Sequence, residues 1–328
     1  MKTLKLKVLA LIAFLGIGLI SCNDDEPAPL GIPNPAASNI IAQMSVIPEL
    51  STMLAALDKT GLRQALSGSE QLTVYAPSNA AFTAFLTANS FANLDVVPTA
   101  DLKNLLLNHV INGRIAIDGI DSNLYKTLGN YPGTTRSSWM AFNGGSAKLN
   151  NDATVSSTIR NVNASNGILH VMNKVVKFAT VADLVLGTPN LSTLGGFVTN
   201  GNNADVVAAL TATTAKTVFA PSNAAFATAT KTSAPIGFLV GNTSIPNVNA
   251  LLKYHVTTGN RTASTLMNND VVNTLFTMPT QRTIQISNSG GSISLIDSGP
   301  TTNAKVTKAD VEGSDGVIHI IDAVMNPF

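Results

Sequence analysis

The chain has 328 residues, of which only 12% are charged, and its 20 Lys and Arg nearly balance its 19 Asp and Glu. No cluster of Lys or Arg follows Lys7, so the sequence lacks the basic patch that nucleic acids require, and we expect no nucleic-acid partner. Cys22 is the one cysteine, which excludes an intramolecular disulfide.

The N-terminus is typical of an export signal. Lys2, Lys5 and Lys7 precede an uncharged apolar run, Val8–Ile20, that is shorter than the roughly 17–25 residues of a membrane-spanning helix. We interpret residues 1–21 as a signal peptide. The letters LISC end at Cys22 and resemble a bacterial lipobox, so we expect Cys22 to be lipidated and to attach the protein to a membrane.

Residues 22–35 read as a tether. Asp24–Glu26 resemble the short acidic tract that directs some lipoproteins of Gram-negative bacteria to the outer face of the outer membrane, although a solvated linker has the same composition. The prolines that follow favour an extended chain of about 3.1 Å per residue. We therefore expect a lipid-anchored outer-membrane protein exposed at the cell surface.

From residue 36 onward the chain repeats itself. TVYAPSNAAF and TVFAPSNAAF differ only by Tyr75 in the first and Phe219 in the second. Three further pairs keep the same order: PELSTML with PNLSTLG, LLLNHV with LLKYHV, and GILHVMNKVV with GVIHIIDAVM. A duplicated unit explains them, so we predict two domains of similar build with autonomous cores, at residues 36–179 and 180–328.

The decapeptide predicts a strand that turns into a helix. Pro77 ends strand pairing, and Ser78 and Asn79 offer side-chain oxygens to cap a helix that starts near Ala80. The same reading applies to Pro221, Ser222 and Asn223 of the second copy.

The other repeated blocks predict a helix and a central strand. Apolar helical spacing includes a histidine in each half: Leu102, Leu105, Leu106, His109 and Val110, then Val248, Leu251, Leu252, His255 and Val256. The turns SNG and SDG introduce apolar strands at 168–176 and 317–324 that contain His170 and His319.

These blocks resemble the fasciclin domain family. The decapeptides are similar to its first signature, the strands with His170 and His319 to its second, and Tyr254-His255 to its central Tyr-His motif, where the first half has Asn108 instead of tyrosine. The resemblance implies an α+β fold of two tandem domains, each a β-wedge or sandwich flanked by α-helices. It also implies a role in cell adhesion and extracellular-matrix contacts.

The sequence offers few residues suited to a catalytic or a metal site. The four histidines are the groups suited to acid–base work at neutral pH, but two per half without cysteine or a placed carboxylate make a poor zinc site. We expect buried, hydrogen-bonded imidazoles, no catalytic residue, no metal and no cofactor. The acids Asp310, Glu312 and Asp315 do not follow a calcium-loop spacing.

The sequence thus indicates a non-enzymatic surface lipoprotein that binds an extracellular protein or polysaccharide through two domains. An accessory subunit of an outer-membrane glycan-uptake or assembly complex is the alternative, and a hydrolase hidden in the segment 131–151 is a third reading. Tyr131 and Trp139 of that segment are candidate exposed aromatics of a binding loop. The ligand and the oligomeric state stay open.

Overall fold

The computed structural model describes residues 38–327 except 118–121, 133, 135–136, 144–146, 200–203, 230–244, 278–279, 281 and 298–302, and only the backbone of 245–247. The expected signal peptide at 1–21, the lipidation site Cys22 and the tether at 22–35 lie outside the described residues. Within the described part of the chain, no helix is both long and apolar enough to cross a bilayer.

The first half opens with helices that cover one side of a sheet. Its described elements are α1 (Ile40–Ser45), η1 (Pro48–Leu50), α2 (Ser51–Thr60), α3 (Leu62–Leu66), β1 (Leu72–Pro77), α4 (Asn79–Ala88), η2 (Leu94–Val96), α5 (Thr99–Leu107), β2 (Val110–Asn112), β3 (Asn123–Asn130), β4 (Ser137–Asn143), β5 (Lys148–Leu149), β6 (Ala153–Thr154), β7 (Val162–Ala164) and β8 (Gly167–Met172).

The described strands of this half form one curled sheet in the order β6-β5-β4-β3-β2-β1-β8-β7. Inside it, β1 runs parallel to β8 with Tyr75 opposite His170, so the two signature blocks lie side by side although they are far apart in sequence. A bridge between Val155 and Met172 brings the chain after β6 back to the end of β8. Gly167 admits no side chain, because its φ is +151° and a Cβ would lie 1.9 Å from the carbonyl oxygen of Leu72.

The second half repeats this plan. Its described elements are α6 (Val181–Gly187), η4 (Pro189–Leu191), α7 (Ser192–Thr199), α8 (Ala204–Thr211), β9 (Lys216–Pro221), α9 (Asn223–Ala229), α11 (Ile245–Tyr254), β10 (Val256–Thr258), η5 (Ala263–Thr265), β11 (Val271–Asn273), β12 (Thr283–Ser289), β13 (Ser292–Ile296), β14 (Asn303–Gly313) and β15 (Gly316–Ile321).

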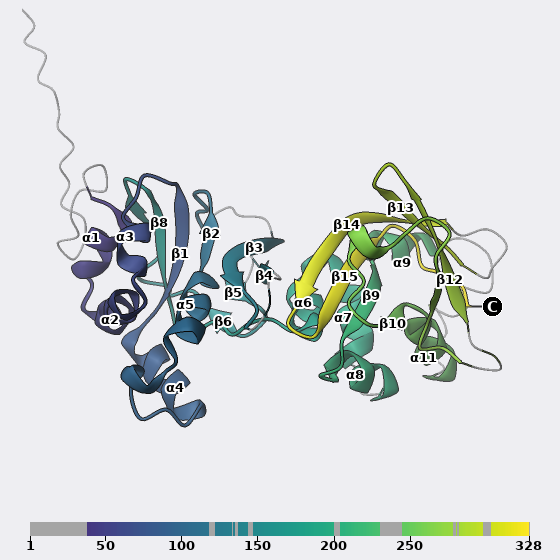
Figure 1. Cartoon of the computed structure of the whole chain (residues 1–328), viewed down its shortest axis with the longest axis horizontal. Helices are drawn as coiled ribbons and strands as arrows, with labels where there is room; N and C mark the ends of the chain where they lie inside the picture. Colours follow the sequence, from purple (N-terminus) through teal and green to yellow (C-terminus); the bar gives the residue numbers. More distant parts are fainter. Residues whose placement is uncertain are drawn as a thin grey trace, which may run out of the picture.

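The second sheet, among the described strands, has the order β10-β9-β15-β14-β13-β12-β11. β9 runs parallel to β15 with Phe219 opposite His319, as β1 does to β8. A bridge between Thr257 and Thr274 joins the two outer strands, so this sheet closes almost into a barrel. Figure 1 shows the two halves side by side along the long axis, each with its helices against its own sheet. The α+β architecture in two tandem units is confirmed.

Each half buries apolar side chains on both faces of its sheet, but the second half does not do so alone. In the first half, Val74 lies in the helix-side core and Tyr75 in the core inside the curl. In the second half, the helix-side core around α6 to α9 also includes Leu124 and Ala141 of the first half. The prediction of two autonomous cores is therefore wrong for the second domain, whose core extends across the boundary.

The helices that carry the repeated histidines end earlier than predicted. α5 stops at Leu107, and Val110 is already the first residue of β2. The His109 ring bonds the Leu105 carbonyl at 2.7 Å, while the His109 N–H turns to the Leu106 carbonyl, so a further helical turn cannot form. The strands β8 and β15 also end before residues 176 and 324, where the chain leaves the sheet.

Candidate functional site at the domain junction

The repeated strand-to-helix corner joins two repeated sequence blocks. Ser78 caps α4 by accepting a hydrogen bond from the Ala81 N–H. The Asn79 amide instead reaches the PELST block: its oxygen accepts from the Thr52 N–H at 2.9 Å, and its nitrogen donates to the Pro48 carbonyl and the Ser51 hydroxyl, both at 3.0 Å.

The second copy repeats these bonds. Ser222 accepts from the Ala225 N–H at 3.1 Å, and Asn223 bonds Thr193, Pro189 and Ser192 of the PNLST block. Pro77 and Pro221 are the last residues of β1 and β9. The corner residues thus hold the first helices of each domain, and their bonds are all internal.

His109 and His255 tie the end of each domain to its core. Each ring donates from Nδ1 to a carbonyl at 2.7 Å, that of Leu105 or Leu251, and accepts at Nε2 from a backbone N–H. These N–H groups belong to Val176 at 2.8 Å and Met325 at 3.0 Å. Burial, partly offset by the bond to the carbonyl, lowers the pKa of both histidines from 6.5 to about 4. Both rings are therefore neutral at physiological pH.

His170 and His319 sit on the central strands and are equally engaged. Their Nε2 atoms lie 2.9 Å from the Ile115 carbonyl and 2.7 Å from the Arg261 carbonyl. His170 Nδ1 accepts from the Asn161 N–H at 3.1 Å, and His319 Nδ1 lies at 3.4 Å from that of Asp310. Burial lowers the pKa of His319, against smaller opposing effects of the Arg261 carbonyl and Asp310.

The histidines of one domain are thus not brought together as a site, since each ring bonds backbone groups of a different segment. Among the described residues, no group of three or more His, Cys, Asp and Glu side chains is placed to hold a metal ion. The acids of the 310–315 loop are used in the fold: Asp310 accepts from the Ala263 N–H and Asp315 from the Val181 N–H, both at 2.7 Å.

Asn108 and Tyr254 show what the departure from the Tyr-His motif does. Tyr254 is buried in the second domain and donates its hydroxyl hydrogen to the Thr283 carbonyl at 2.8 Å. Asn108 instead donates to the carbonyls of Val176 at 3.0 Å and Lys177 at 3.4 Å. The first domain therefore uses this position to hold the segment that leads into the second domain.

Tyr131 and Trp139 are not the exposed aromatics of a binding loop that the sequence suggested. Tyr131 is 2% exposed, and its hydroxyl donates to the Glu312 carbonyl of the second domain at 2.6 Å. Trp139 is partly buried against the second domain's core, and the Lys308 ammonium lies 5.3 Å from its ring. Both aromatics are junction residues, because the outer face of β4 is covered by α6 and β14.

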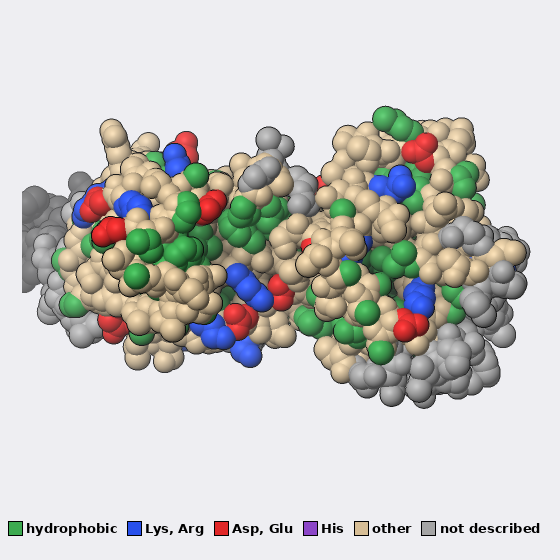
Figure 2. Space-filling view, turned by 60° about the horizontal axis from the view of Figure 1, so that its bottom comes forward, with side chains coloured by type: hydrophobic (Ala, Val, Ile, Leu, Met, Phe, Trp, Pro, Cys, Tyr) green, Lys and Arg blue, Asp and Glu red, His purple; other side chains and the backbone are tan. Residues whose placement is uncertain are grey.

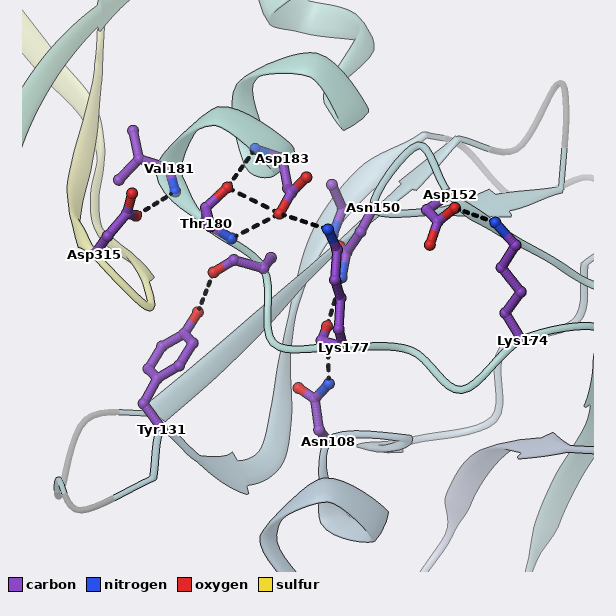
Figure 3. Close-up of polar contacts among 12 residues, drawn as sticks. Asn108, Tyr131, Asn150, Asp152, Lys174, Lys177, Thr180, Val181, Asp183 and Asp315 are labelled. Atoms are coloured by element: carbon purple, nitrogen blue, oxygen red, sulfur yellow. Dashed lines mark hydrogen bonds and ion pairs between the residues drawn. The ribbon is translucent and has the colours of Figure 1, made fainter. Parts of the chain in front are cut away.

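The segment between the domains is held from both sides (Figure 3). On the first domain, Asn108 and Asn150 donate to the Lys177 carbonyl, each at 3.4 Å. On the second, Thr180 and Asp183 form a capping box at the start of α6, and Lys177 lies 3.8 Å from Asp183. The linker therefore contacts both domains as well as joining them.

The sequence analysis did not predict several residues of the domain junction. Leu124 and Ala141 pair across β3 and β4, and their side chains point away from the first domain's own core. Gly187 of α6 packs on Ala141 so closely that a Cβ would lie 2.8 Å from the Ala141 Cβ. The one signal was in β4, where Trp139 and Ala141 on the outer face are as apolar as Met140 and Phe142 on the inner face, whereas a strand with a solvent face alternates apolar and polar residues.

A model of the fasciclin domain family matches residues 48–177 and 190–327. Periostin from Homo sapiens is 28% identical over 286 residues, which cover 82% of this chain and 30% of periostin. Transforming growth factor-beta-induced protein ig-h3 from Sus scrofa is 26% identical over 303 residues, which cover 89% of this chain and 38% of that protein. Protein sll1483 from Synechocystis sp. is 32% identical over 127 residues, which cover 38% of this chain and 66% of that protein. The chain therefore spans less than two thirds of each of these relatives.

Among solved structures, a FAS1 domain pair from the insect cell adhesion molecule fasciclin I is similar with a TM-score of 0.50. The match covers 83% of this chain and 92% of that pair at 18% identity, which is a likeness of fold. Since the family model matches each half in turn, the resemblance is confirmed, and the chain belongs to the fasciclin domain family with two fasciclin domains in tandem.

Proposed function

We propose that the protein is a non-enzymatic lipoprotein that binds an extracellular protein or polysaccharide and so attaches the cell to its surroundings. The observation that carries this proposal is the junction, where Tyr131, Trp139 and the linker fix two fasciclin domains in one orientation. A fixed pair presents its surfaces at constant spacing, so a ligand that meets both domains does not pay for ordering them. The adhesion molecule fasciclin I, similar in fold, also contains such a pair.

The engaged imidazoles support a binding role rather than a reaction. His109 and His255 use both ring nitrogens on backbone groups, and their lowered pKa keeps them uncharged. A general acid or base needs a nitrogen within reach of a substrate. On the face seen in Figure 2, positive and negative side chains are interspersed rather than gathered into a field of one sign. That surface suits short-range contacts with a large ligand more than long-range steering.

Retention on surfaces tests the binding role. Polysaccharides, matrix proteins and whole cells are passed over the immobilised chain from Asn23 onward, and over an immobilised Tyr131→Phe, Trp139→Ala variant with a loosened junction. We expect retention above background for the parent chain and at least several-fold weaker retention for the variant. Background retention of the parent on every surface contradicts the proposal.

The proposed location has its own test. We propose processing after residue 21, lipidation of Cys22, a tether to residue 35 and domains at 36–179 and 180–328, with display on the outer face of the outer membrane. Protease added to intact cells should remove the protein without lysis. A Cys22→Ser variant should leave the membrane fraction. A protein that resists protease until the cells are broken contradicts surface display.

A further inference from the structure

The first domain offers a specific face to the second. Leu124 and Ala141 are paired neighbours on the outer face of β3 and β4, and Trp139 lies two residues from Ala141 on the same face. α6 and β14 cover this face, with Gly187 against Ala141.

The second domain has a counterpart of that face, which the hydrogen bonds identify. Thr127 Oγ1 accepts from the Gly129 N–H at 3.2 Å, and Thr274 Oγ1 accepts from the Phe276 N–H at the same distance. Thr127 pairs with Ile111 of β2, and Thr274 with Thr257 of β10. Counting three residues back along each strand, Val271 takes the place of Leu124.

The partner strands extend the correspondence. Thr127 donates to the Ser138 carbonyl and Thr274 to the Arg282 carbonyl, so Gln285 takes the place of Ala141. Gln285 pairs with Val271, as Ala141 does with Leu124. The face of the second domain that matches the junction is therefore the outer face of β11 and β12.

This counterpart face is uncovered among the described residues. Val271 is 64% exposed, and Ile296, which pairs with Gln285 from the other side, is 36% exposed. The adjacent strand positions Val272 and Ile284 point inward and are buried. Val271 and Ile296 are thus exposed on this face, whereas the equivalent face of the first domain is buried by the second domain.

The covering element also has a counterpart that no described residue covers. α1 matches α6, since the Asn166 side chain accepts from the Ile40 N–H as Asp315 does from the Val181 N–H. The residue of the first domain that matches Gly187 is Val46, just after α1, and it is 40% exposed. Of the five large hydrophobic side chains exposed in the described residues, Val46, Val271 and Ile296 lie on these two faces.

We propose that two copies of the chain associate head to tail, with the α1 end of one copy docked on the β11–β12 face of another. The occupant is a second copy, because one chain carries both uncovered surfaces: the β11–β12 face, which matches the covered face of β3 and β4, and the α1 end, which matches the covering helix α6. The contact joins unlike surfaces and leaves one of each free, so it builds an open chain or a ring of several copies rather than a two-fold dimer. The proposal depends on the fold and not on the proposed ligand.

The docking is weaker than the junction. Gln285 and Thr283 stand where Ala141 and Trp139 provide apolar contact, and Val46 holds the elements further apart than Gly187 does. Anchoring to a membrane would raise the local concentration of copies and compensate for low affinity. We therefore expect association at high micromolar concentration in solution.

Cysteine crosslinking tests the pairing directly, because the chain from Asn23 onward has no cysteine of its own. Chains with Val46→Cys and Gln285→Cys, the positions that match Gly187 and Ala141 of the junction, are mixed under mild oxidation. We expect the mixed dimer in at least fivefold excess over either homodimer, and a ladder of multimers when one chain carries both changes. Val96→Cys, at a 54% exposed valine outside both faces, is the matched control and should pair with neither.

Sedimentation velocity gives a second measurement without crosslinks. Association should disappear in a Val271→Lys, Ile296→Lys variant and persist in Val96→Lys, with the melting temperature confirming that each variant is folded. A parent chain that stays monomeric at millimolar concentration overturns the proposal. Equal crosslinking of Val46→Cys and Val96→Cys with Gln285→Cys, or a dominant homodimer, also overturns it.

Discussion

Tyr75 and Phe219 occupy matching places and differ by one hydroxyl group. Each ring stacks on the histidine of the parallel strand, with centroids 5.2 Å apart for Tyr75 and His170 and 5.6 Å for Phe219 and His319. The Tyr75 hydroxyl is buried and has no hydrogen-bond partner among the described residues. Burial, with a smaller effect of Tyr125, raises its pKa well above the usual range.

We therefore expect Tyr75→Phe to keep or raise the free energy of unfolding, by up to about 1–3 kcal/mol, since it removes an unsatisfied buried polar group. Phe219→Tyr should lower it by a similar amount. Urea denaturation of both variants checks this. A clear loss of stability in Tyr75→Phe would show that the hydroxyl has a partner.

The buried histidines predict a dependence of stability on pH. The pKa of His109 and His255 is about 4 in the folded protein and 6.5 in the unfolded chain, so between these values the unfolded chain binds more protons. Stability is fully present above about pH 6.5 and falls as the pH drops toward 4, by at most roughly 3 kcal/mol per histidine.

The double variant His109→Gln, His255→Gln separates this effect from that of the carboxylates. Denaturation in urea from pH 7.5 to 4 should give a shallower decline of the unfolding free energy in the variant than in the parent. Parallel curves would mean that the two imidazoles already titrate normally in the fold.

At the scale of elements, the Asn79 amide joins α4 to the start of α2 through three hydrogen bonds. We expect Asn79→Ala to lower the free energy of unfolding by about 1–3 kcal/mol, and Ser78→Ala, which removes a helix cap, by about 1 kcal/mol. Thr83→Ala is the control, because its exposed hydroxyl makes only a local bond to the Asn79 carbonyl. Equal stability of Asn79→Ala and Thr83→Ala would contradict the role of the amide.

The elements that the sequence predicted well are those whose chemistry is local. Pro77 ends the strand and Ser78 caps the helix through interactions with neighbouring residues only, so a short stretch of sequence was enough to predict the corner. The end of α5 could not be predicted in this way. It depends on the His109 ring, which bonds the Leu105 carbonyl that would otherwise accept the next helical N–H. The junction was missed for a similar reason: Leu124 and Ala141 show that an outer face is apolar, but not which element covers it.

At the scale of the whole molecule, the close approach of Gly187 to Ala141 decides whether the domains stay together. A Cβ at Gly187 would lie 2.8 Å from the Ala141 Cβ, so Gly187→Val should push α6 away from β4. We expect a larger radius of gyration by small-angle scattering and two thermal transitions in place of one.

Gly196→Val is the matched control, because a Cβ at Gly196 meets no atom within 4 Å. It should leave both the scattering profile and the single transition unchanged. An unaltered radius of gyration in Gly187→Val would mean that the junction accommodates the larger side chain and that α6 and β4 are not in tight contact.

The parallel pairing of β1 with β8 and of β9 with β15 has a consequence for biogenesis. In each domain the first strand of the sheet pairs with the last strand in sequence, so neither strand has its full set of partners until the domain is nearly complete. A chain synthesised from its N-terminus cannot complete the first sheet until Met172 has been added, nor the second until Ile321 has. Each domain is therefore the smallest unit that can fold, and a chain cut between β9 and β15 should leave the second domain without a complete sheet.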